Sequence, residues 1–346
     1  MSAYAIGVDL GGTNLRIAAV DEQGQLLEKA TLGTKVARGR DYVIDQMTDS
    51  IQRMAAKIGQ QGALAGIGIG VPGIIDLETG MLRESPNLPG WSDYPVRAEI
   101  ERRLNTTVIL ENDANAAALG EKWLGAARDL DDMCMLTLGT GVGGGLVLGG
   151  RIFHGMTGMA GEFGHLTVYP DGHPCKCGNR GCVEQYASAT AIVRMAREAI
   201  ATGAAAQLAR AAESDPEFSA RIIYNLAIQG DEPSRAIFRR VGEALGIVLA
   251  DIVNGLNLPM YVVGGGVSSA WEAFAPSIFA ILPRRSMVYA ATAPLERTSE
   301  AAGAAGEVQP RAVARRTIVT RALLGSDAGL YGAARLPLMA RESTRR

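Results

Sequence analysis

Residues 4–20 read YAIGVDLGGTNLRIAAV, two short apolar runs on either side of a Gly-Gly turn. Such a pattern predicts a β-hairpin with strands at Tyr4–Leu10 and Leu15–Val20. Residues 133–148 read MCMLTLGTGVGGGLVL and repeat this plan, with expected strands at Met133–Leu138 and Gly144–Leu148. Each half of the chain therefore begins with a hairpin of the same design, and each glycine turn marks a place where the backbone can approach a ligand.

Strands and helices alternate after each hairpin, which predicts an α/β protein built from a duplicated unit. A duplicated unit of this kind would place the two glycine turns face to face across a cleft. In the first half we expect strands at Leu26–Leu32, Leu64–Val71 and Thr107–Leu110, and helices at Val43–Ile58, Val96–Leu104 and Ala114–Leu124, the last capped by Asp113. In the second half we expect strands at Ile152–Phe153, Met260–Val263 and Thr317–Thr320, helices at Ala191–Ile200, Arg235–Leu256, about Ser269–Leu282 and Ala322–Ala334, a helical insertion at Ala201–Gln229, and an exposed loop or frayed helix at Glu296–Arg311.

Composition excludes several classes of protein. The chain has 346 residues, long enough for two domains, and 34 Lys and Arg against 36 Asp and Glu give a formal net charge of −2. This balance disfavours a nucleic-acid binder, which needs a basic face. No apolar run approaches the roughly 18–20 residues of a membrane helix, and the start shows no signal peptide. We therefore expect a cytoplasmic protein without a membrane or nucleic-acid partner.

The glycine turns are candidates for phosphate binding. In Asp9-Leu10-Gly11-Gly12-Thr13-Asn14, backbone N–H groups can approach phosphate oxygens while the carboxylate holds a hydrated Mg²⁺, although an ordinary hairpin has the same pattern. Gly139-Thr140-Gly141-Val142-Gly143 and the two glycines after it cost a strand pair roughly 0.5–1 kcal/mol per glycine, so a bound polyphosphate is the expected compensation. Gly264-Gly265-Gly266 suits the flat face of a nucleoside. None of the three turns carries the Gly-Lys-Ser/Thr of a P-loop, and a strand rather than a helix follows the second.

Three of the four cysteines and one histidine have metal-ligand spacing. Cys175, Cys177 and Cys182 follow His165 closely, which gives the three thiolates and one imidazole of a closed tetrahedral zinc site. Four protein ligands leave no open position, so this zinc would be structural. A redox pair at Cys175 and Cys177 is the alternative, and His173 is a rival fourth ligand by proximity. Cys134 lies in an apolar strand and is expected to be a buried hydrophobe.

Carboxylates and one amide are candidates for contacts with a hydroxylated substrate. Glu111-Asn112-Asp113 ends a buried strand at a helix start, where a rigidly held carboxylate can take a proton from a hydroxyl and Asn112 can bond other hydroxyls; simple helix capping by Asp113 is the alternative. Glu162 and Glu184 flank the proposed zinc ligands. They are either surface charges or chelators of vicinal sugar hydroxyls.

Taken together, these motifs resemble the ROK family of repressors, open reading frames and sugar kinases, and most of all its bacterial glucokinases. The resemblance covers nearly the whole chain. It rests on GVDLGGT at residues 7–13, GVPG at 70–73, ENDAN at 111–115, LGTGVGGG at 138–145, HG at 154–155, GMAGEFGH at 158–165 and CKCGNRGCVE at 175–184.

The resemblance implies the two-lobed, actin-like (ribonuclease-H-like) fold of ATPases and sugar kinases, with a structural zinc loop. The smaller lobe would comprise residues 1–115 and about 318–346, and the larger lobe about 116–317. The expected activity is transfer of the γ-phosphoryl group of ATP, with Mg²⁺, to the 6-hydroxyl of a hexose, D-glucose first. The resemblance also suggests a homodimer or homotetramer.

The resemblance assigns roles to individual residues. Asp113 would be the general base. The sugar contacts would be Asn87, Asn112, Asp113, Glu162, His165 and Glu184, with His165 also on zinc beside Cys175, Cys177 and Cys182. The nucleotide contacts would be Asp9, Gly11, Gly12, Thr13, Asn14, Gly139, Thr140, Gly141, Val142, Gly143, Gly265 and Gly266.

Two alternatives remain within this resemblance. One is a different kinase of the family, acting on N-acetylglucosamine, N-acetylmannosamine or fructose, or using polyphosphate. The other is a sugar-sensing regulator without turnover. Family repressors carry a helix-turn-helix domain before the first phosphate motif; here eight residues precede Asp9, so we expect no such domain and favour an enzyme.

Overall fold

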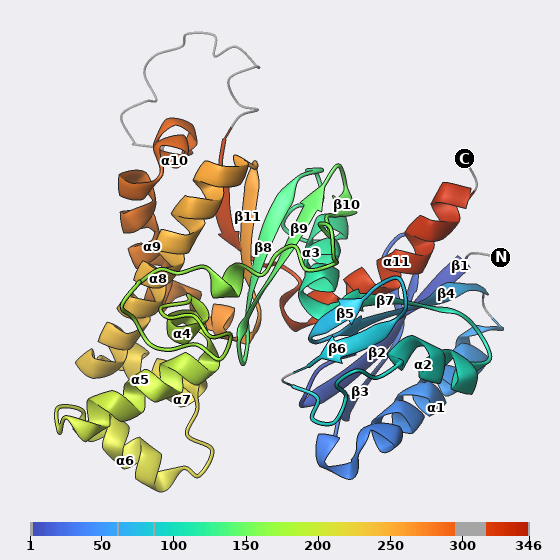
Figure 1. Cartoon of the computed structure of the whole chain (residues 1–346), viewed down its shortest axis with the longest axis horizontal. Coiled ribbons are helices and arrows are strands. Elements are labelled where there is room, and N and C mark those ends of the chain that lie inside the picture. Colours follow the sequence, from blue (N-terminus) through green and yellow to red (C-terminus); the bar gives the residue numbers. More distant parts are fainter. Residues whose placement is uncertain (1–2, 61, 86, 295–315, 345–346) are drawn as a thin grey trace. The chain divides into compact units, whose positions relative to one another are not determined.

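The computed structural model describes residues 3–60, 62–85, 87–294 and 316–344, and its contacts divide the chain into two compact units (Figure 1). Unit 1 comprises Met1–Met135, Gly144–Gly161 and Ala322–Arg346, and unit 2 comprises Leu136–Gly143 and Glu162–Arg321. The lobe limits that the sequence suggests stay a prediction. The expected loop at Glu296–Arg311 lies outside the described residues.

A five-stranded sheet forms the centre of unit 1. Its order is β3-β2-β1-β4-β7, from strands β1 (Ala3–Leu10), β2 (Asn14–Asp21), β3 (Leu26–Gly33), β4 (Ala63–Val71) and β7 (Val108–Asn112). The strands β1, β2 and β3 pair antiparallel, whereas β4 lies parallel to β1 and β7 parallel to β4. The first predicted hairpin and the strands after it are thereby confirmed. A short hairpin, β5 (Ile74–Asp76) and β6 (Met81–Glu84), was not predicted.

The two faces of this sheet differ in side-chain size. Even-numbered residues of β1, such as Ile6 and Val8, belong to a large apolar core with α1 (Arg40–Ile58) and α2 (Val96–Leu104). Odd-numbered Ala5 faces the other side and packs with Leu330 and Ala334. Because side chains alternate along a strand, Asp9 lies on this second, small-residue face.

The helices α3 (Asp113–Trp123) and α11 (Ala328–Thr344) pack on the small-residue face and against each other. A Cβ added to Gly68 would lie 1.9 Å from the carbonyl oxygen of Ala333, and one added to Gly332 would lie 1.6 Å from that of Ala116. These glycines therefore allow close backbone packing.

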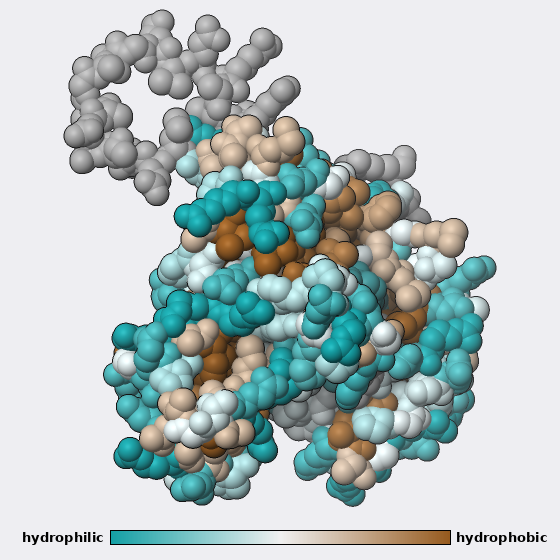
Figure 2. Space-filling model, turned by 60° about the vertical axis from the view of Figure 1, so that its left-hand side comes forward, coloured by the Kyte–Doolittle hydropathy of each residue, from teal (hydrophilic) through white to brown (hydrophobic). Residues whose placement is uncertain are grey.

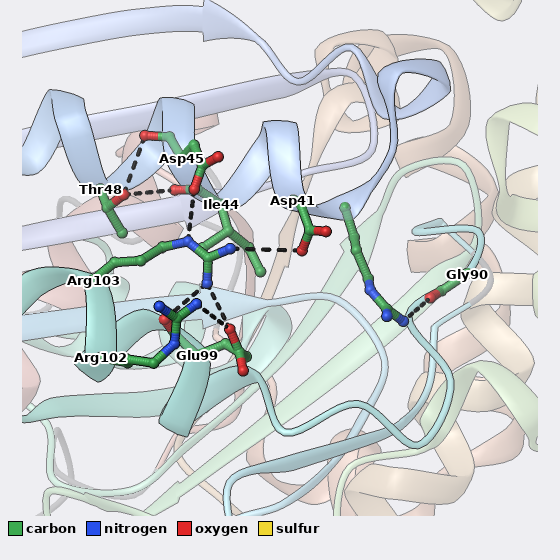
Figure 3. Close-up of polar contacts among 9 residues, drawn as sticks. Asp41, Ile44, Asp45, Thr48, Gly90, Glu99, Arg102 and Arg103 are labelled. Atoms are coloured by element: carbon green, nitrogen blue, oxygen red, sulfur yellow. Dashed lines mark hydrogen bonds and ion pairs between the residues drawn. The ribbon is translucent and has the colours of Figure 1, made fainter.

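A half-buried arginine joins the two helices on the large-residue face (Figure 3). Arg103 of α2 contacts Asp45 at 2.6 Å and Asp41 at 3.6 Å on α1, and Glu99 at 2.7 Å on its own helix. With only 15% of its side chain exposed, this arginine is screened less from its partners than a surface arginine. The contacts hold α1 and α2 side by side.

The second sheet repeats the strand order of the first. It runs β10-β9-β8-β11-β12, from β8 (Met133–Leu138), β9 (Val142–Leu148), β10 (Arg151–Ile152), β11 (Met260–Gly264) and β12 (Ile318–Arg321). The division between the units falls within β8 and β9. The duplicated plan is therefore confirmed at the level of strand order, and Cys134 is buried in β8 as expected.

Unit 2 is otherwise mostly helical. Its helices are α4 (Glu184–Ala187), α5 (Ala189–Ala201), α6 (Ala206–Ser214), α7 (Ala220–Ile228), α8 (Glu232–Leu256), α9 (Trp271–Arg285) and α10 (Met287–Thr292). The predicted insertion at Ala201–Gln229 is indeed helical, since it contains α6 and α7. Figure 2 shows a surface that is mostly hydrophilic, with smaller hydrophobic areas. Among the helices of the described ranges, none is long and apolar enough to cross a bilayer.

The last helix begins later than predicted, at Ala328 instead of Ala322. The backbone N–H groups of Leu323 and Leu324 donate to the buried carboxylate of Glu121 on α3, at 3.1 and 2.8 Å. Since this contact holds the segment after β12 in a non-helical course, α11 starts only beyond it.

Candidate functional site

The first glycine turn is fixed by its carbonyl groups. Gly11 donates its N–H to Asn14 at 2.9 Å, which closes the hairpin between β1 and β2. Thr34 is fully buried after β3 and donates two hydrogen bonds to the turn. Its hydroxyl donates to the carbonyl of Gly11 at 2.6 Å, and its backbone N–H donates to the carbonyl of Thr13 at 2.9 Å. Thr34 thus holds these carbonyl groups on the β3 side of the turn. This arrangement suits a turn whose amide N–H groups bind an anion. The supporting role of Thr34 was not predicted.

Asp9 is the next-to-last residue of β1, beside this turn, and it forms an ion pair. Its Oδ2 lies 3.0 Å from Nη1 of Arg16, the residue directly opposite in the β1–β2 register. Burial raises the pKa of the Asp9 carboxyl, and Arg16 opposes that rise. The first turn of α11 also approaches it, because a Cβ on Gly329 would lie 3.3 Å from Oδ1. A carboxylate at this position fits the role expected of Asp9, which is to hold Mg²⁺ through water. The residue pairing expected for the predicted hairpin could already have identified Arg16 as the partner of Asp9.

The helix α3 is capped by Asn112 and not, as predicted, by Asp113. Asn112 has extended backbone angles, and its Oδ1 accepts the N–H groups of Ala114 and Asn115 at 2.9 and 3.2 Å. Its Nδ2 donates to the carbonyl of Gly73 at 3.1 Å. Asp113 is therefore the first helical residue, half-buried, with Oδ1 accepting the N–H of Ala114 at 2.9 Å. This places a carboxylate rigidly where β7 meets α3.

Behind Asp113, a buried glutamate and a histidine form a pair that sequence reasoning missed. Glu111 is 3% exposed, and its Oε2 lies 2.7 Å from Nε2 of His154. This hydrogen bond raises the pKa of His154, while partial burial of the ring opposes the rise. Two features of the sequence could have pointed to this pair. Glu111 lies two positions before Asp113, and His154 belongs to the His154-Gly155 motif.

Asn87 lies on an exposed bend beside the first turn. A Cβ on Gly12 would lie 2.9 Å from the carbonyl oxygen of Asn87, so only glycine allows this approach. Leu88 and Trp91, each 1% exposed, anchor the bend in the core, and Arg40 donates to Gly90 at 3.2 Å (Figure 3). Asn87, Gly12 and Asp9 therefore belong to one neighbourhood of unit 1.

The second glycine turn is fixed in the same way within unit 2. The carbonyls of Gly139 and Thr140 accept from Ala189 N–H and the Thr190 hydroxyl at the start of α5, each at 2.8 Å. In addition, the N–H of Val142 donates to Oε2 of Glu184 at 3.0 Å. A predicted sugar ligand, Glu184, is thus bonded directly to the predicted phosphate turn.

Four potential metal ligands cluster in the loop before α4. The ligand atoms of His165, Cys175, Cys177 and Cys182 all lie within 4.8 Å of one another. Zinc–sulfur bonds of about 2.3 Å in a tetrahedron place two sulfurs about 3.8 Å apart. Cys177 and Cys182 have Sγ atoms 3.7 Å apart, and Cys175 Sγ lies 3.7 Å from His165 Nδ1. The donor set and spacing fit zinc. His173 is not part of the cluster, and its Nδ1 instead contacts the carbonyl of Pro174.

The thiols of this cluster differ in pKa. Burial raises the pKa of Cys182 to about 12, whereas the backbone at Asn179 lowers that of Cys177. Without a cation, Cys182 would stay protonated at neutral pH. A divalent metal supplies the charge that keeps such a thiol ionised.

The cysteine loop is tied to both a carboxylate and a long helix. His165 turns Nε2 toward Glu162, with 3.9 Å to Oε2. Tyr186 binds the N–H of His173 at 2.9 Å and packs edge-on against Tyr169, and the guanidinium of Arg240 on α8 lies 3.9 Å over the Tyr169 ring. These contacts fix the loop on α8.

Gly265 and Gly266 follow β11 as predicted. Gly265 has φ +81°, and a Cβ there would lie 2.5 Å from the carbonyl oxygen of Leu138. A 3₁₀ helix (Gly266–Ala270) follows, in place of the immediate α-helix that the sequence suggests, and α9 begins at Trp271. The glycine pair therefore forms a tight bend directly beside β8.

The predicted site residues fall into two groups. Unit 1 holds Asp9, Gly11, Gly12, Thr13, Asn14, Asn87, Asn112 and Asp113. Unit 2 holds Gly139, Thr140, Gly141, Val142, Gly143, Glu162, His165, Cys175, Cys177, Cys182, Glu184, Gly265 and Gly266. Each group is assembled within its own unit, and the convergence of the two glycine turns on one triphosphate stays a prediction.

The fold and these motifs define a protein of the actin-like ATPase and sugar kinase class. The profile of the ROK family matches residues 5–338, so the chain belongs to the ROK family. It is 42% identical over 267 residues to a glucokinase of Thermotoga maritima, covering 77% of this chain and 83% of that one.

Two further relatives show the range of the family. A crystal structure of a ROK family glucokinase from Streptomyces griseus in complex with glucose and AMPPNP matches with a TM-score of 0.74 and 34% identity, covering 96% of this chain and 98% of that one. A xylose repressor of Caldicellulosiruptor bescii is 32% identical over 284 residues, covering 82% of this chain and 71% of that one.

Proposed function

We propose that this protein is a glucokinase, which transfers the γ-phosphoryl group of ATP to the 6-hydroxyl of D-glucose. The class of ATP-dependent sugar kinase follows from the family and from relatives named glucokinase. The structural observation that carries the proposal is Asp113, a half-buried carboxylate fixed at the junction of β7 and α3. Glucose as the acceptor is supported by the relatives' names and by the complex with glucose.

In the proposed mechanism, Asp113 accepts the proton of the 6-hydroxyl as that oxygen attacks the γ-phosphorus. Phosphoryl transfer passes through a loose transition state, so in-line positioning and charge neutralisation provide most of the rate enhancement. The amides of the two glycine turns would bind the phosphates. Asn87, Asn112, Glu162, His165 and Glu184 are proposed to bind the other hydroxyls of the sugar.

Two metal ions are part of the proposal. Asp9 would hold Mg²⁺ through water, and this ion would neutralise charge on the phosphates. His165, Cys175, Cys177 and Cys182 would hold a structural zinc, which orders the loop that carries Glu162 and His165.

A coupled assay of ADP release with a panel of hexoses tests the proposal. We expect the highest kcat/KM with D-glucose, less with mannose, fructose and the N-acetylated amino sugars, and no turnover of 6-deoxyglucose, which lacks the acceptor. A preference for N-acetylglucosamine, N-acetylmannosamine or fructose would contradict the assignment of glucose. Polyphosphate is tested as the donor by measuring hexose 6-phosphate directly, because a reaction with polyphosphate releases no ADP.

The similarity to a xylose repressor makes a sugar-sensing regulator the second candidate. Such a protein would bind a sugar in calorimetry and release no ADP with any hexose. The predicted dimer or tetramer is tested separately by light scattering.

A further inference from the structure

The carboxylate of Glu111 is the centre of a hydrogen-bond cluster within unit 1. Its Oε1 accepts the backbone N–H of Asn112 at 2.9 Å and Nδ2 of Asn115 at 3.1 Å. Its Oε2 lies 2.7 Å from Nε2 of His154. The cluster therefore connects the end of β7, the first turn of α3 and the segment that follows β10.

The burial of Glu111 makes these partners necessary. The residue is 3% exposed and Asn115 is 2% exposed. A carboxylate removed from water needs hydrogen-bond donors to offset its lost solvation, and losing one leaves a buried acceptor unsatisfied. His154 supplies the third donor of the set, so its loss would leave one oxygen of Glu111 unsatisfied.

The same carboxylate controls the backbone that presents Asp113. Glu111 holds the N–H of Asn112, and the side chain of Asn112 caps α3 through Ala114 and Asn115. Asp113 lies between these fixed points, as the first residue of the helix. A shift of Glu111 would therefore move the direction from which Asp113 meets a substrate.

His154 is built to hold Glu111 in place. A carboxylate only accepts hydrogen bonds, so Nε2 of His154 must carry a proton in this contact. The backbone around the ring is fixed, since Phe153 N–H donates to Leu146 at 2.8 Å and Ala160 N–H donates to the carbonyl of His154 at 3.1 Å. Glu111 is the charged group in the described contacts of this ring, and it stabilises the imidazolium.

We propose that His154 is a positioning residue for Asp113, acting through the buried carboxylate of Glu111. The proposal rests on the proposed function, because it takes Asp113 as the base that accepts the hydroxyl proton. His154 itself touches no reacting atom. Its contribution is to keep the β7–α3 junction in the one geometry that aligns Asp113 with the acceptor.

Two substitutions of His154 test the proposal, with a control on the neighbouring strand. In His154→Ala the donor is lost, and we expect kcat to fall roughly 10- to 100-fold while the KM for hexose changes less than about twofold. His154→Gln can still donate an N–H, so it should recover part of that loss. Arg151→Gln removes a positive charge from exposed β10 and should leave both constants unchanged.

The pH profile separates positioning from a purely structural role. In the wild type, kcat should decline as the pH rises through the raised pKa of His154, because the charge-assisted hydrogen bond to Glu111 then weakens to one donated by a neutral ring. The amide of His154→Gln does not titrate, so this variant should lack that decline. Wild-type kcat and an unchanged pH profile in His154→Ala would overturn the proposal.

A double-mutant cycle tests the route through Glu111. If His154 acts through Glu111, adding His154→Gln to Glu111→Gln should cost less than about twofold further in kcat. Independent, multiplying losses would overturn this route. Near-UV circular dichroism reports whether each variant folds, and His154→Gln alone keeps the test decisive if Glu111→Gln does not. Wild-type protein that releases no ADP with any hexose would instead contradict the proposed function itself.

Discussion

The β7–α3 junction in unit 1 and the cysteine loop in unit 2, here residues 162–183, hold their chemical groups by different means. At the junction, Asp113 follows a strand that is paired to β4 up to Asn112, and a buried carboxylate fixes the turn. The cysteine loop is fully described, and its regular structure consists of one 3₁₀ turn at Phe163–His165 and isolated bridges such as Thr167↔Cys182. The junction is therefore held by the sheet and by one buried carboxylate, whereas the loop has little regular structure and carries four potential metal ligands.

This difference separates two kinds of dependence. Backbone hydrogen bonds and apolar packing at the junction form together with the sheet, so Asp113, the proposed base, is in place whenever unit 1 is folded. The loop is held by contacts such as that of Tyr186 with His173, and the proposed zinc on its three thiolates and one imidazole would add to that order. Changes at the junction should affect catalysis directly, while changes in the loop should act through metal content.

The largest effect is expected from Asp113→Asn, which keeps the shape of the side chain but removes the proton acceptor. We expect kcat to fall about 10²- to 10⁴-fold, the range for a general base, with little change in hexose affinity. Steady-state kinetics and calorimetric titration with glucose measure the two quantities. A kcat near that of the wild type would exclude Asp113 as the base. It would also contradict the expectation that changes at the junction affect catalysis directly.

Cys177→Ser tests the loop. We expect loss of the metal, measured at about one zinc per wild-type chain by elemental analysis, and a loss of hexose phosphorylation of at least about tenfold. Cys134→Ala is the matched control, because Cys134 is buried in β8 outside the cluster and should keep both metal and activity. A zinc-free variant that retains activity would show that the loop is ordered without metal.

Gly141→Ala tests the bond between the second glycine turn and Glu184. A Cβ at this position would lie 2.3 Å from Oε2 of Glu184 and displace it from the N–H of Val142. We expect the KM values for ATP and hexose to rise together by about three- to tenfold, since the net contribution of a typical hydrogen bond is roughly 0.5–1.5 kcal/mol. A Cβ added at Gly139 would have no atom within 4 Å, so Gly139→Ala should have the smaller effect. A rise in the KM of only one substrate would show that Glu184 does not connect the binding of ATP with the binding of hexose.

The smallest effect is expected on the pH dependence of stability. The pKa of His154 is raised in the folded state, so its stabilisation is complete below the unfolded pKa of about 6.5 and is lost as the pH rises through the folded value. Denaturant unfolding of the zinc-loaded protein should show this decline in the free energy of unfolding, and His154→Gln should show less of it. Identical pH dependence in both proteins would mean that the pair adds no stability to the junction.

The sequence predicted most elements, and its errors have local causes. Asn and Asp are equally good helix caps, so composition could not choose between Asn112 and Asp113. Pairing of Val71 with Asn112 extends β7 by two residues beyond the predicted strand and decides for Asn112. The late start of α11 depends in turn on Glu121, a residue some 200 positions away along the chain that binds the N–H groups of Leu323 and Leu324.

The candidate site shows the same division. Motif spacing pointed to His165, Cys175, Cys177 and Cys182 as potential metal ligands, because close spacing along the chain imposes proximity in space, but it left His173 as a rival that only the structure sets apart from the cluster. Glu111 and His154 lie 43 residues apart, and no local pattern brings them together. Only the packing of β10 and its following segment near α3 does so.

The sequence by itself determined the duplicated hairpin plan, the glycine turns, the cysteine cluster and the carboxylate at the strand end, since each depends on neighbours along the chain. The tertiary structure alone decided which partner polar groups of distant segments meet: Glu184 for Val142, and His154 for Glu111. The physical reason is that a buried charge or N–H group must find its complement in space, and that complement is set by packing between elements rather than by local preference.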